Sequence, residues 1–266
     1  MNLTAKRTNG ILALALSFGF LAASPLAAEL TGTEIMVKVY DRPQARDMSA
    51  ILAMTLVNAQ GLTRNRVLQQ YQADFGTAEK KMMFFLEPAD VRGTAFMNWS
   101  YDKVDRSDEQ WIFLPALKKI KRISSEGRGD AFMGSDFSYE DLATRQPSLD
   151  NHSFLRFETL EGSECLVVES IPRDRKSSLY SKTVSWIRPD VWIGLRREYY
   201  DARGLLLKTL TIRRVGELGG YWMILETEMK NAQTGHSTRM SFSGVKLDTG
   251  IKESLFSERS LEKGVK

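Results

Sequence analysis

The chain has 266 residues, of which 37 are Lys or Arg and 33 are Asp or Glu, giving a formal net charge of +4 at pH 7. So small an excess of positive charge gives no indication of a nucleic-acid partner. One cysteine, Cys165, excludes an internal disulfide, so an apolar core must stabilise the fold, which this length permits. The apolar neighbours of Cys165 favour a buried, inert thiol over a reactive one.

Residues 1–28 have the pattern of a cleavable secretory signal peptide. Lys6 and Arg7 precede an apolar run from Ile11 to Leu21, and small residues end at Ala28. The apolar run is shorter than the roughly 20 residues that span a bilayer. Cleavage would leave one domain, residues 29–266, with a formal net charge of +2. We expect an exported, soluble protein.

After residue 48 the apolar residues recur with a period of two, which predicts strands separated by turn residues. The expected strands cover residues 49–60, 64–75, 80–87, 93–101, 110–114, 118–123, 154–160, 164–171, 183–187, 195–200, 205–215, 221–229 and 236–247. Short helices are expected within 33–45, from 136 or 138 to 143, and from 257 or 258 to 263. Many strands with short connections predict a mainly β fold with one curved antiparallel sheet.

Alternation within the strands indicates that one face of this sheet is rich in aromatic residues and methionine while the other is polar. The residues assigned to the apolar face are Tyr71, Phe75, Met97, Trp99, Met223, Leu225, Met240 and Phe242. A large twisted sheet curls into a trough. Two alternatives stay open for that trough: a core filled by the chain itself, or a cavity left for an apolar ligand.

The stretch from Gln110 to Leu142 combines three unlike pieces: an apolar run, a basic cluster, and a Gly-rich loop that carries Phe132 and Met133. Large apolar side chains on such a loop must cover something or be covered. The basic cluster consists of Lys118, Lys119, Lys121 and Arg122. It is either a solvated strand face or a docking site for anionic headgroups or an acidic partner.

The sequence gives no indication of an enzyme or of a bound cofactor. His152 and His236 are the only histidines, and no Cys/His cluster has the spacing of a metal site. The acids Asp136, Glu140 and Asp141 are interpreted as solvated residues at a helix start rather than as a catalytic pair.

The runs Trp111 to Ile123 and Phe132 to Leu142, together with Thr234 to Phe242 and Ser254 to Ser257, resemble the bacterial outer membrane lipoprotein-sorting protein family, which is LolA-like. The resemblance implies a half-open β-barrel with short helices covering its mouth, working in the periplasm. It also implies that Trp99, Trp111, Phe113, Phe132 and Met133 belong to an apolar lining for acyl chains. It carries over no catalytic residue.

The resemblance further implies a carrier that shuttles the acyl chains of a lipid or lipoprotein between membranes, with transient membrane contact. Relatives often accompany RND- or MMPL-type inner-membrane exporters. A lid around residues 124–135, with glycines as hinges, would open the trough. The alternatives are an RseB-like periplasmic sensor that binds lipidated ligands and a protein partner, and a scaffold with a filled core.

Overall fold

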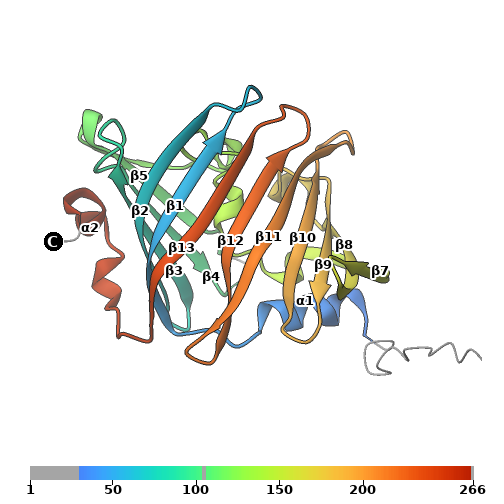
Figure 1. Ribbon diagram of the computed structural model, residues 1–266. Coiled ribbons are helices and arrows are strands. Elements are labelled where there is room, and N and C mark those ends of the chain that lie inside the picture. The colour runs from blue at the N-terminus through green and yellow to red at the C-terminus, as the bar shows by residue number, and fades with distance from the viewer. Residues whose placement is uncertain (1–29, 104–105, 265–266) are drawn as a thin grey trace, which may run out of the picture.

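The computed structural model describes residues 30–103 and 106–264, and within them one antiparallel sheet of 13 strands dominates the fold (Figure 1). The predicted signal peptide, residues 1–28, lies outside the described residues. The first half of the sheet contains β1 (Asp47–Val57), β2 (Thr63–Asp74), β3 (Ala78–Glu87), β4 (Ala95–Tyr101), β5 (Glu109–Leu114) and β6 (Lys119–Arg122). The second half contains β7 (Asp150–Leu160), β8 (Ser163–Pro172), β9 (Lys182–Arg188), β10 (Ile193–Tyr200), β11 (Leu206–Leu218), β12 (Tyr221–Asn231) and β13 (Ser237–Leu247).

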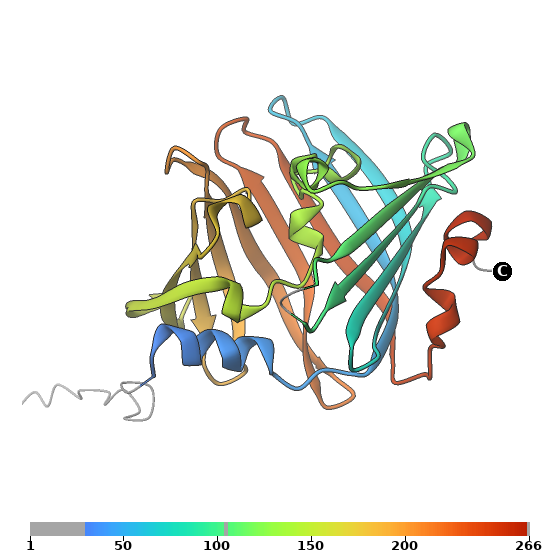
Figure 2. The same ribbon diagram turned by 180° about the vertical axis from the view of Figure 1, so that it is seen from behind.

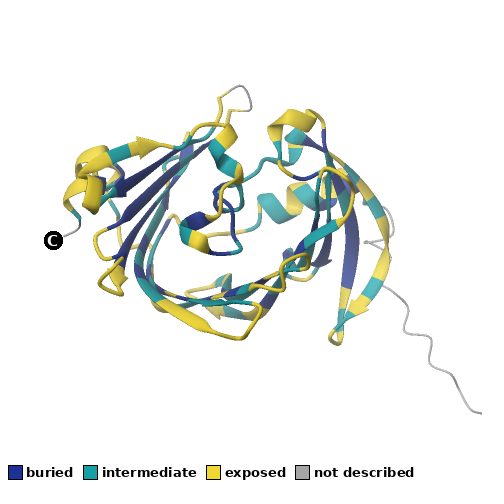
Figure 3. Ribbon diagram, turned by 90° about the horizontal axis from the view of Figure 1, so that it is seen from above, coloured by how far each residue is buried: buried dark blue, intermediate teal, exposed yellow. Residues whose placement is uncertain are grey.

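The two halves are meanders that meet in the middle of the sheet. The strand order is β6-β5-β4-β3-β2-β1-β13-β12-β11-β10-β9-β8-β7, so β1 pairs with β13 and the sheet ends at β6 and β7. Seen from above, the sheet curves into an open U (Figure 3). The predicted half-open barrel is therefore confirmed, and each expected strand overlaps an observed one.

One connection, residues 123–149, joins β6 to β7, and we call it the crossing segment. Because β6 and β7 are the two opposite edges of the sheet, this segment must pass from one arm of the U to the other. It does so through short 3-10 turns on the concave side, as seen from behind in Figure 2: Glu126–Gly129, Phe132–Gly134, Glu140–Leu142 and Pro147–Leu149.

The N-terminal helix α1 (Gly32–Tyr40) begins with a capping box between Thr31 and Glu34 and ends before Pro43. Its Ile35 side chain is fully buried against Leu166 and Val168 of β8, on the concave side of the second half of the sheet.

The C-terminal helix α2 (Glu258–Lys263) is capped by Ser257, whose side chain accepts from the backbone N–H of Ser260. It lies outside the U, against the convex face of the first half (Figure 2). Phe256 and Leu261 anchor it there, and both are buried. The two helices thus cover opposite faces of the sheet.

Replacing Gly32 by alanine should displace α1 from the sheet. A Cβ atom at Gly32 would lie 2.7 Å from backbone atoms of His152, Ser153 and Phe154 in β7, and backbone cannot yield as a flexible side chain does. We expect a loss of about 1–3 kcal/mol in the free energy of unfolding, measured by urea denaturation. In the matched control Gly194→Ala, the nearest atom lies 3.9 Å away, so the change should stay within about 0.5 kcal/mol. Equal losses in the two variants would contradict this contact.

Candidate functional site

The concave face of the sheet presents a continuous apolar surface formed by both halves. Register fixes which side chains share it: Leu52 of β1 faces Leu68 of β2 and Phe242 of β13, and Met54 faces Met240. The buried sheet residues of this surface are Leu52, Met54, Leu68, Met83, Phe85, Phe96, Ile112, Tyr199, Met229 and Met240.

The crossing segment covers this surface with its own side chains. Phe132 is fully buried, and its ring centroid lies 5.3 Å from that of Phe96 and 5.9 Å from that of Phe85. Phe137, Tyr139 and Leu142 are buried in the same cluster. The turn that directs Phe132 inward uses left-handed backbone at Met133 (φ 51°) and Gly134 (φ 74°). Of the two alternatives for the trough, the filled core describes this structure.

Polar side chains on the concave face hold the crossing segment through its backbone. Each of four strands supplies one donor to one carbonyl oxygen of the segment: Arg66 Nη1 to Met133 O; Lys208 Nζ to Asp136 O at 3.0 Å; Gln110 Nε2 to Tyr139 O at 2.8 Å; Lys81 Nζ to Leu142 O at 3.1 Å. An irregular segment that crosses an apolar trough needs such partners, because an unpaired buried carbonyl is costly.

At the centre lies a buried ion pair between Lys208 of β11 and Asp141 of the crossing segment. Lys208 Nζ is 2.5 Å from Asp141 Oδ2, and the two side chains are only 5% and 3% exposed. The other oxygen of Asp141 accepts from the Tyr180 hydroxyl at 2.7 Å, and the Ser138 hydroxyl donates to Oδ2 at 2.9 Å. Removing one partner of such a pair typically costs about 3–5 kcal/mol because the other charge stays buried.

Burial changes the proton affinities of several groups around this ion pair. It raises the pKa of Tyr199 to about 12 and also raises the pKa of Tyr180, which the Asp141 carboxylate raises further, so both hydroxyls stay protonated at neutral pH. Burial likewise raises the pKa of Asp136 and of Glu140, although hydrogen bonds to each oppose it. The packed crossing segment therefore favours the protonated forms of Asp136 and Glu140. Its packing on the sheet becomes less favourable as the pH rises from the ordinary carboxyl pKa through the raised pKa values of these two groups.

Part of the predicted lining does lie on the concave side. Phe132, Met133, Met240 and Phe242 belong to the central cluster. Leu225 and Met223 alternate onto the face of Thr227, which pairs with Met240. Whether any of these residues binds lipid stays a prediction.

The other half of the predicted lining is on the convex face, so the prediction of one common lining is wrong. Tyr71, Phe75, Met97, Trp99, Trp111 and Phe113 pack under the C-terminal segment with Phe256 and Leu261. Alternation shows which residues share a face within one strand, but it does not say which face of the next strand continues it. The sequence did contain one signal that both faces of the first half are covered: Met82 to Phe85 is an uninterrupted apolar run, and all four residues are buried in the structure.

The interpretation of Asp141 as a solvated acid is also wrong, and the sequence reasoning missed its partners. Lys208 alternates onto the same face of β11 as Leu210, which packs against the central cluster, and Ile212, which is buried. A lysine in an otherwise apolar alternation is a signal for a buried charge, since lysine is rarely buried without a partner. Tyr180 and Tyr199 carried no comparable signal.

The basic cluster is exposed at the free edge of the sheet. Lys118 lies in the turn before β6, while Lys119, Lys121 and Arg122 are in that strand. Arg122 pairs with Glu109 at 2.5 Å, but its side chain is 63% exposed, so the pair adds little stability. The adjacent Leu117 is also 63% exposed.

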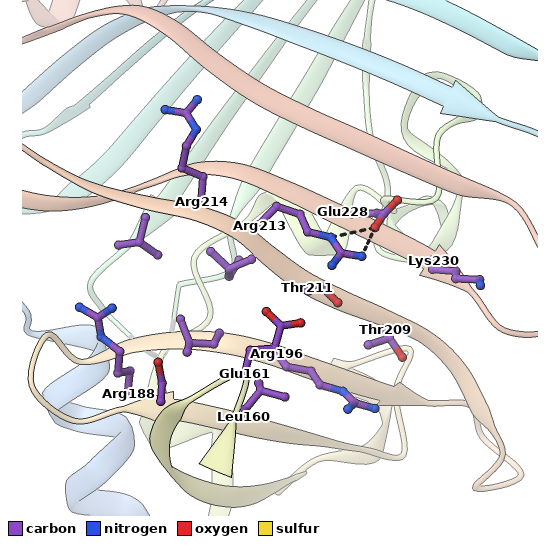
Figure 4. Close-up of a pocket in the computed structure, with 14 residues that line it drawn as sticks. Leu160, Glu161, Arg188, Arg196, Thr209, Thr211, Arg213, Arg214, Glu228 and Lys230 are labelled. Carbon is purple, nitrogen blue, oxygen red and sulfur yellow. Dashed lines mark hydrogen bonds and ion pairs between the residues drawn. The ribbon is translucent and has the colours of Figure 1, made fainter. Parts of the chain in front are cut away.

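A hollow of about 510 Å³ lies on the convex side of the second half (Figure 4). Arginines line much of it, but each pairs locally: Arg213 with Glu228 at 2.5 Å, and Arg196 with Glu198 at 2.5 Å. The two arginine side chains are 43% and 35% exposed, and ion pairs this close to solvent add little, so this hollow is assigned no role.

Residues 30–103 and 106–264 contain no group of three or more His, Cys, Asp or Glu side chains arranged to hold a metal ion. In the same residues, no helix has both the length and the apolar character needed to cross a membrane.

The fold and the sequence match known proteins. A protein from Vibrio parahaemolyticus described as an outer membrane lipoprotein-sorting protein domain is 36% identical, with a TM-score of 0.82 over 87% of this chain and 98% of that one. The chain belongs to this LolA-like family. A family model for uncharacterized proteins matches residues 77–263, and a comparison with curated proteins gives no match.

Two further structures are similar. A DUF1329 family protein from Desulfovibrio piger is 28% identical, with a TM-score of 0.83 over 90% of this chain and all of that one. A LolA superfamily protein from Nitrosomonas europaea is 20% identical, with a TM-score of 0.68 over 86% and 99% of the two chains, and shows the shared fold alone.

Replacing Phe132 by alanine should loosen the crossing segment of this LolA-like protein. Loss of a fully buried phenyl ring typically costs about 3–5 kcal/mol. Since the ring belongs to the segment rather than to the sheet, we expect faster tryptic cleavage at Arg128, followed by mass spectrometry. The control Phe157→Ala removes the same side chain from β7, where it is 46% exposed, and should leave cleavage at Arg128 unchanged. A Phe132→Ala protein cleaved at the native rate would show that the ring does not hold the segment.

Proposed function

We propose that this protein is a periplasmic carrier that shelters the acyl chains of a lipid or lipoprotein on the concave face of its sheet. The observation that supports this most directly is that one connection, the crossing segment, covers the whole centre of an apolar face. A core that is closed by a single loop can be opened without unfolding the sheet. The proposed role uses binding and release and needs no catalytic residue.

The filled trough is compatible with this role because the crossing segment and a cargo are comparable competitors. Burying a large apolar side chain contributes about 1.5–3 kcal/mol, so Phe132, Phe137, Tyr139 and Leu142 together contribute roughly 6–12 kcal/mol. An acyl chain with a dozen methylenes gains about 10 kcal/mol on the same surface. In apolar burial the two occupants are therefore closely matched, and this permits both loading and release.

The crossing segment has the local features of a lid. Gly127 and Gly129 lie in one of its 3-10 turns, and Gly134, two residues after Phe132, occupies left-handed backbone. Between Met133 and Leu142 its hydrogen bonds to the sheet are separate bonds from sheet side chains, whereas the strands are joined by continuous backbone ladders. Local opening is therefore expected to begin in this segment.

The predicted signal peptide, residues 1–28, supports export to the periplasm. The exposed basic cluster at β6, beside the exposed Leu117, fits transient contact with an anionic membrane surface or with an inner-membrane exporter of the RND or MMPL type. Cargo would pass between such a donor and an acceptor membrane while the crossing segment is displaced.

A disulfide between the crossing segment and the sheet should block cargo exchange. Asp136 and Thr238 are suitable positions, because Thr238 Oγ1 lies 2.7 Å from Asp136 Oδ2 and 2.9 Å from the Asp136 backbone nitrogen. The oxidised double variant Asp136→Cys/Thr238→Cys should take up a fluorescent fatty acyl probe at least roughly 10-fold more slowly than the same protein after reduction.

The single variant Thr238→Cys serves as the control and should load equally fast before and after reduction. Native Cys165 is 1% exposed and will not compete for the new thiols. If the oxidised double variant takes up the probe as fast as the reduced one, with the cross-link verified by mass, the crossing segment does not act as a lid.

Replacing Lys118, Lys119, Lys121 and Arg122 together by glutamine should weaken binding to vesicles of phosphatidylglycerol. Each basic residue near an anionic surface contributes roughly 1 kcal/mol, so we expect a loss of about 100-fold or more at low salt that shrinks as salt is added. Vesicle co-sedimentation across a salt series measures it.

A matched control replaces four basic residues of the convex face by glutamine: Arg213, Arg214, Lys230 and Arg239. This variant has the same net charge as the first but retains the basic β6 edge. If the two variants lose affinity equally, net charge rather than a docking edge controls the binding.

A further inference from the structure

The centre of the concave face contains a lysine whose anionic partner does not come from the sheet. Lys208 belongs to β11. Tyr199, on the adjacent strand β10, packs against Tyr180 with ring centroids 4.8 Å apart and the ring planes tilted by 58°. The ammonium group of Lys208 lies 5.4 Å and 5.6 Å from these two ring centroids. Asp141, which neutralises Lys208, belongs to the crossing segment.

This arrangement has a consequence when the crossing segment is displaced. Lys208 then loses both of its oxygen partners, the Asp141 carboxylate at 2.5 Å and the Asp136 carbonyl at 3.0 Å. Tyr180 loses the carboxylate oxygen to which its hydroxyl donates. Two groups remain that point to the position left by the Asp141 carboxylate: the ammonium of Lys208 in β11 and the hydroxyl of Tyr180, which lies just before β9.

Many of the side chains around this place are apolar, although Arg197, which donates to the Ser185 hydroxyl, lies beside Tyr199. Tyr180 and Tyr199 belong to the same buried cluster as Phe85, Phe96 and Met229. A cargo lying on the surface vacated by Phe132 would therefore bring one end close to Lys208 while its hydrocarbon covers the rest. A charged amine buried without a counter-ion is strongly unfavourable, so the end near Lys208 must supply an anion.

We propose that Lys208 and Tyr180 form a headgroup site for an anionic amphiphile, and that Asp141 occupies this site when the protein is closed. The inference rests on the carrier function proposed above and names its cargo class: a single-chain or double-chain lipid with a carboxylate or phosphate group. Asp141 has the chemistry of such a headgroup, because its two oxygens accept from Lys208 Nζ and from the Tyr180 hydroxyl. Cargo binding replaces one anion by another, so Lys208 is never left unpaired.

The proposal separates this site from a general apolar trough. A neutral lipid would gain the same hydrocarbon burial but would leave Lys208 without an anion. Hydrogen bonds that involve a charged group discriminate by roughly 10-fold to 100-fold. We therefore expect the protein to prefer an anionic amphiphile to its neutral analogue by at least about 10-fold.

The test compares a labelled C16 fatty acid with its methyl ester, which has the same hydrocarbon and no charge. A labelled lysophosphatidic acid of the same chain length forms the phosphate arm, and its affinity relative to the fatty acid distinguishes a phosphate from a carboxylate cargo. Dissociation constants are measured by fluorescence titration of the full chain. The native protein should bind both acids at least about 10-fold more tightly than the ester.

Two variants should shift this preference in opposite directions. Lys208→Met should abolish the preference for the acids, while Asp141→Asn should tighten their binding because the internal anion is gone. The double variant Lys208→Met/Asp141→Asn removes both charges together, so it stays testable if a single variant fails to fold, and it should bind acid and ester equally. Lys230→Met, on the exposed outer side of β12, is the charge-matched control and should retain the native preference.

The failures are distinguishable. If acid and ester bind with equal affinity to the native protein and to all variants, the headgroup site is wrong and the carrier stands. If no probe binds to any of these proteins, including Asp141→Asn, the carrier function is wrong and the headgroup site with it. A preference for the acids that survives in both proteins lacking Lys208 would also overturn this site.

Discussion

The feature on which the rest of this structure depends is the separation of the two free edges of the sheet. Two meanders meet at β1 and β13, so β6 and β7 lie at opposite ends. The chain between them has no short route, and it crosses the concave side. Because β6 and β7 do not pair, the barrel stays open, and the chain that connects them fills its interior.

That crossing explains why an apolar face carries so many polar groups. A segment without a strand partner brings unpaired carbonyls into a buried region, and each needs a donor. Arg66, Lys81, Gln110 and Lys208 each satisfy one. The donors belong to the sheet and remain when the segment leaves, so whatever enters the trough meets a face that is apolar but not uniform. These polar side chains in an apolar lining would allow it to distinguish one cargo from another.

The sequence predicted the strands well because each is a local pattern. Alternation and turn residues are read within a few positions, and all observed strands overlap the expected ones. Which side of the sheet each residue faces is a property of the whole curved sheet. Met82 and Met83 are adjacent, yet one packs under Phe256 and the other against the concave cluster. Alternation places these two neighbours on opposite faces, but no local pattern says which face becomes the concave one.

The candidate site was harder to predict for the same reason. Phe132 and Met133 were found because apolar residues on a glycine-rich loop are conspicuous. Lys208 pairs with a residue 67 positions away, and only the crossing of the trough brings the two together. The apolar alternation around Lys208 signals that its charge is buried, but it does not identify the partner, which only the fold shows.

The two faces of the first half of the sheet also determine which part of the molecule can move. On the convex side the C-terminal segment buries Met82, Phe84, Met97 and Trp111, and Lys80 lies 3.9 Å from the Trp99 ring centroid while pairing with Glu253 at 2.6 Å. Strands that are packed on both faces resist bending, because bending would disturb the packing of both clusters at once. The convex face of the second half, by contrast, carries exposed ion pairs such as Arg213–Glu228. Opening by flexing the first half would therefore be costly, whereas displacing the crossing segment disturbs one cluster and a few hydrogen bonds. The C-terminal cover thus confines the motion to the concave side, where the cargo would bind.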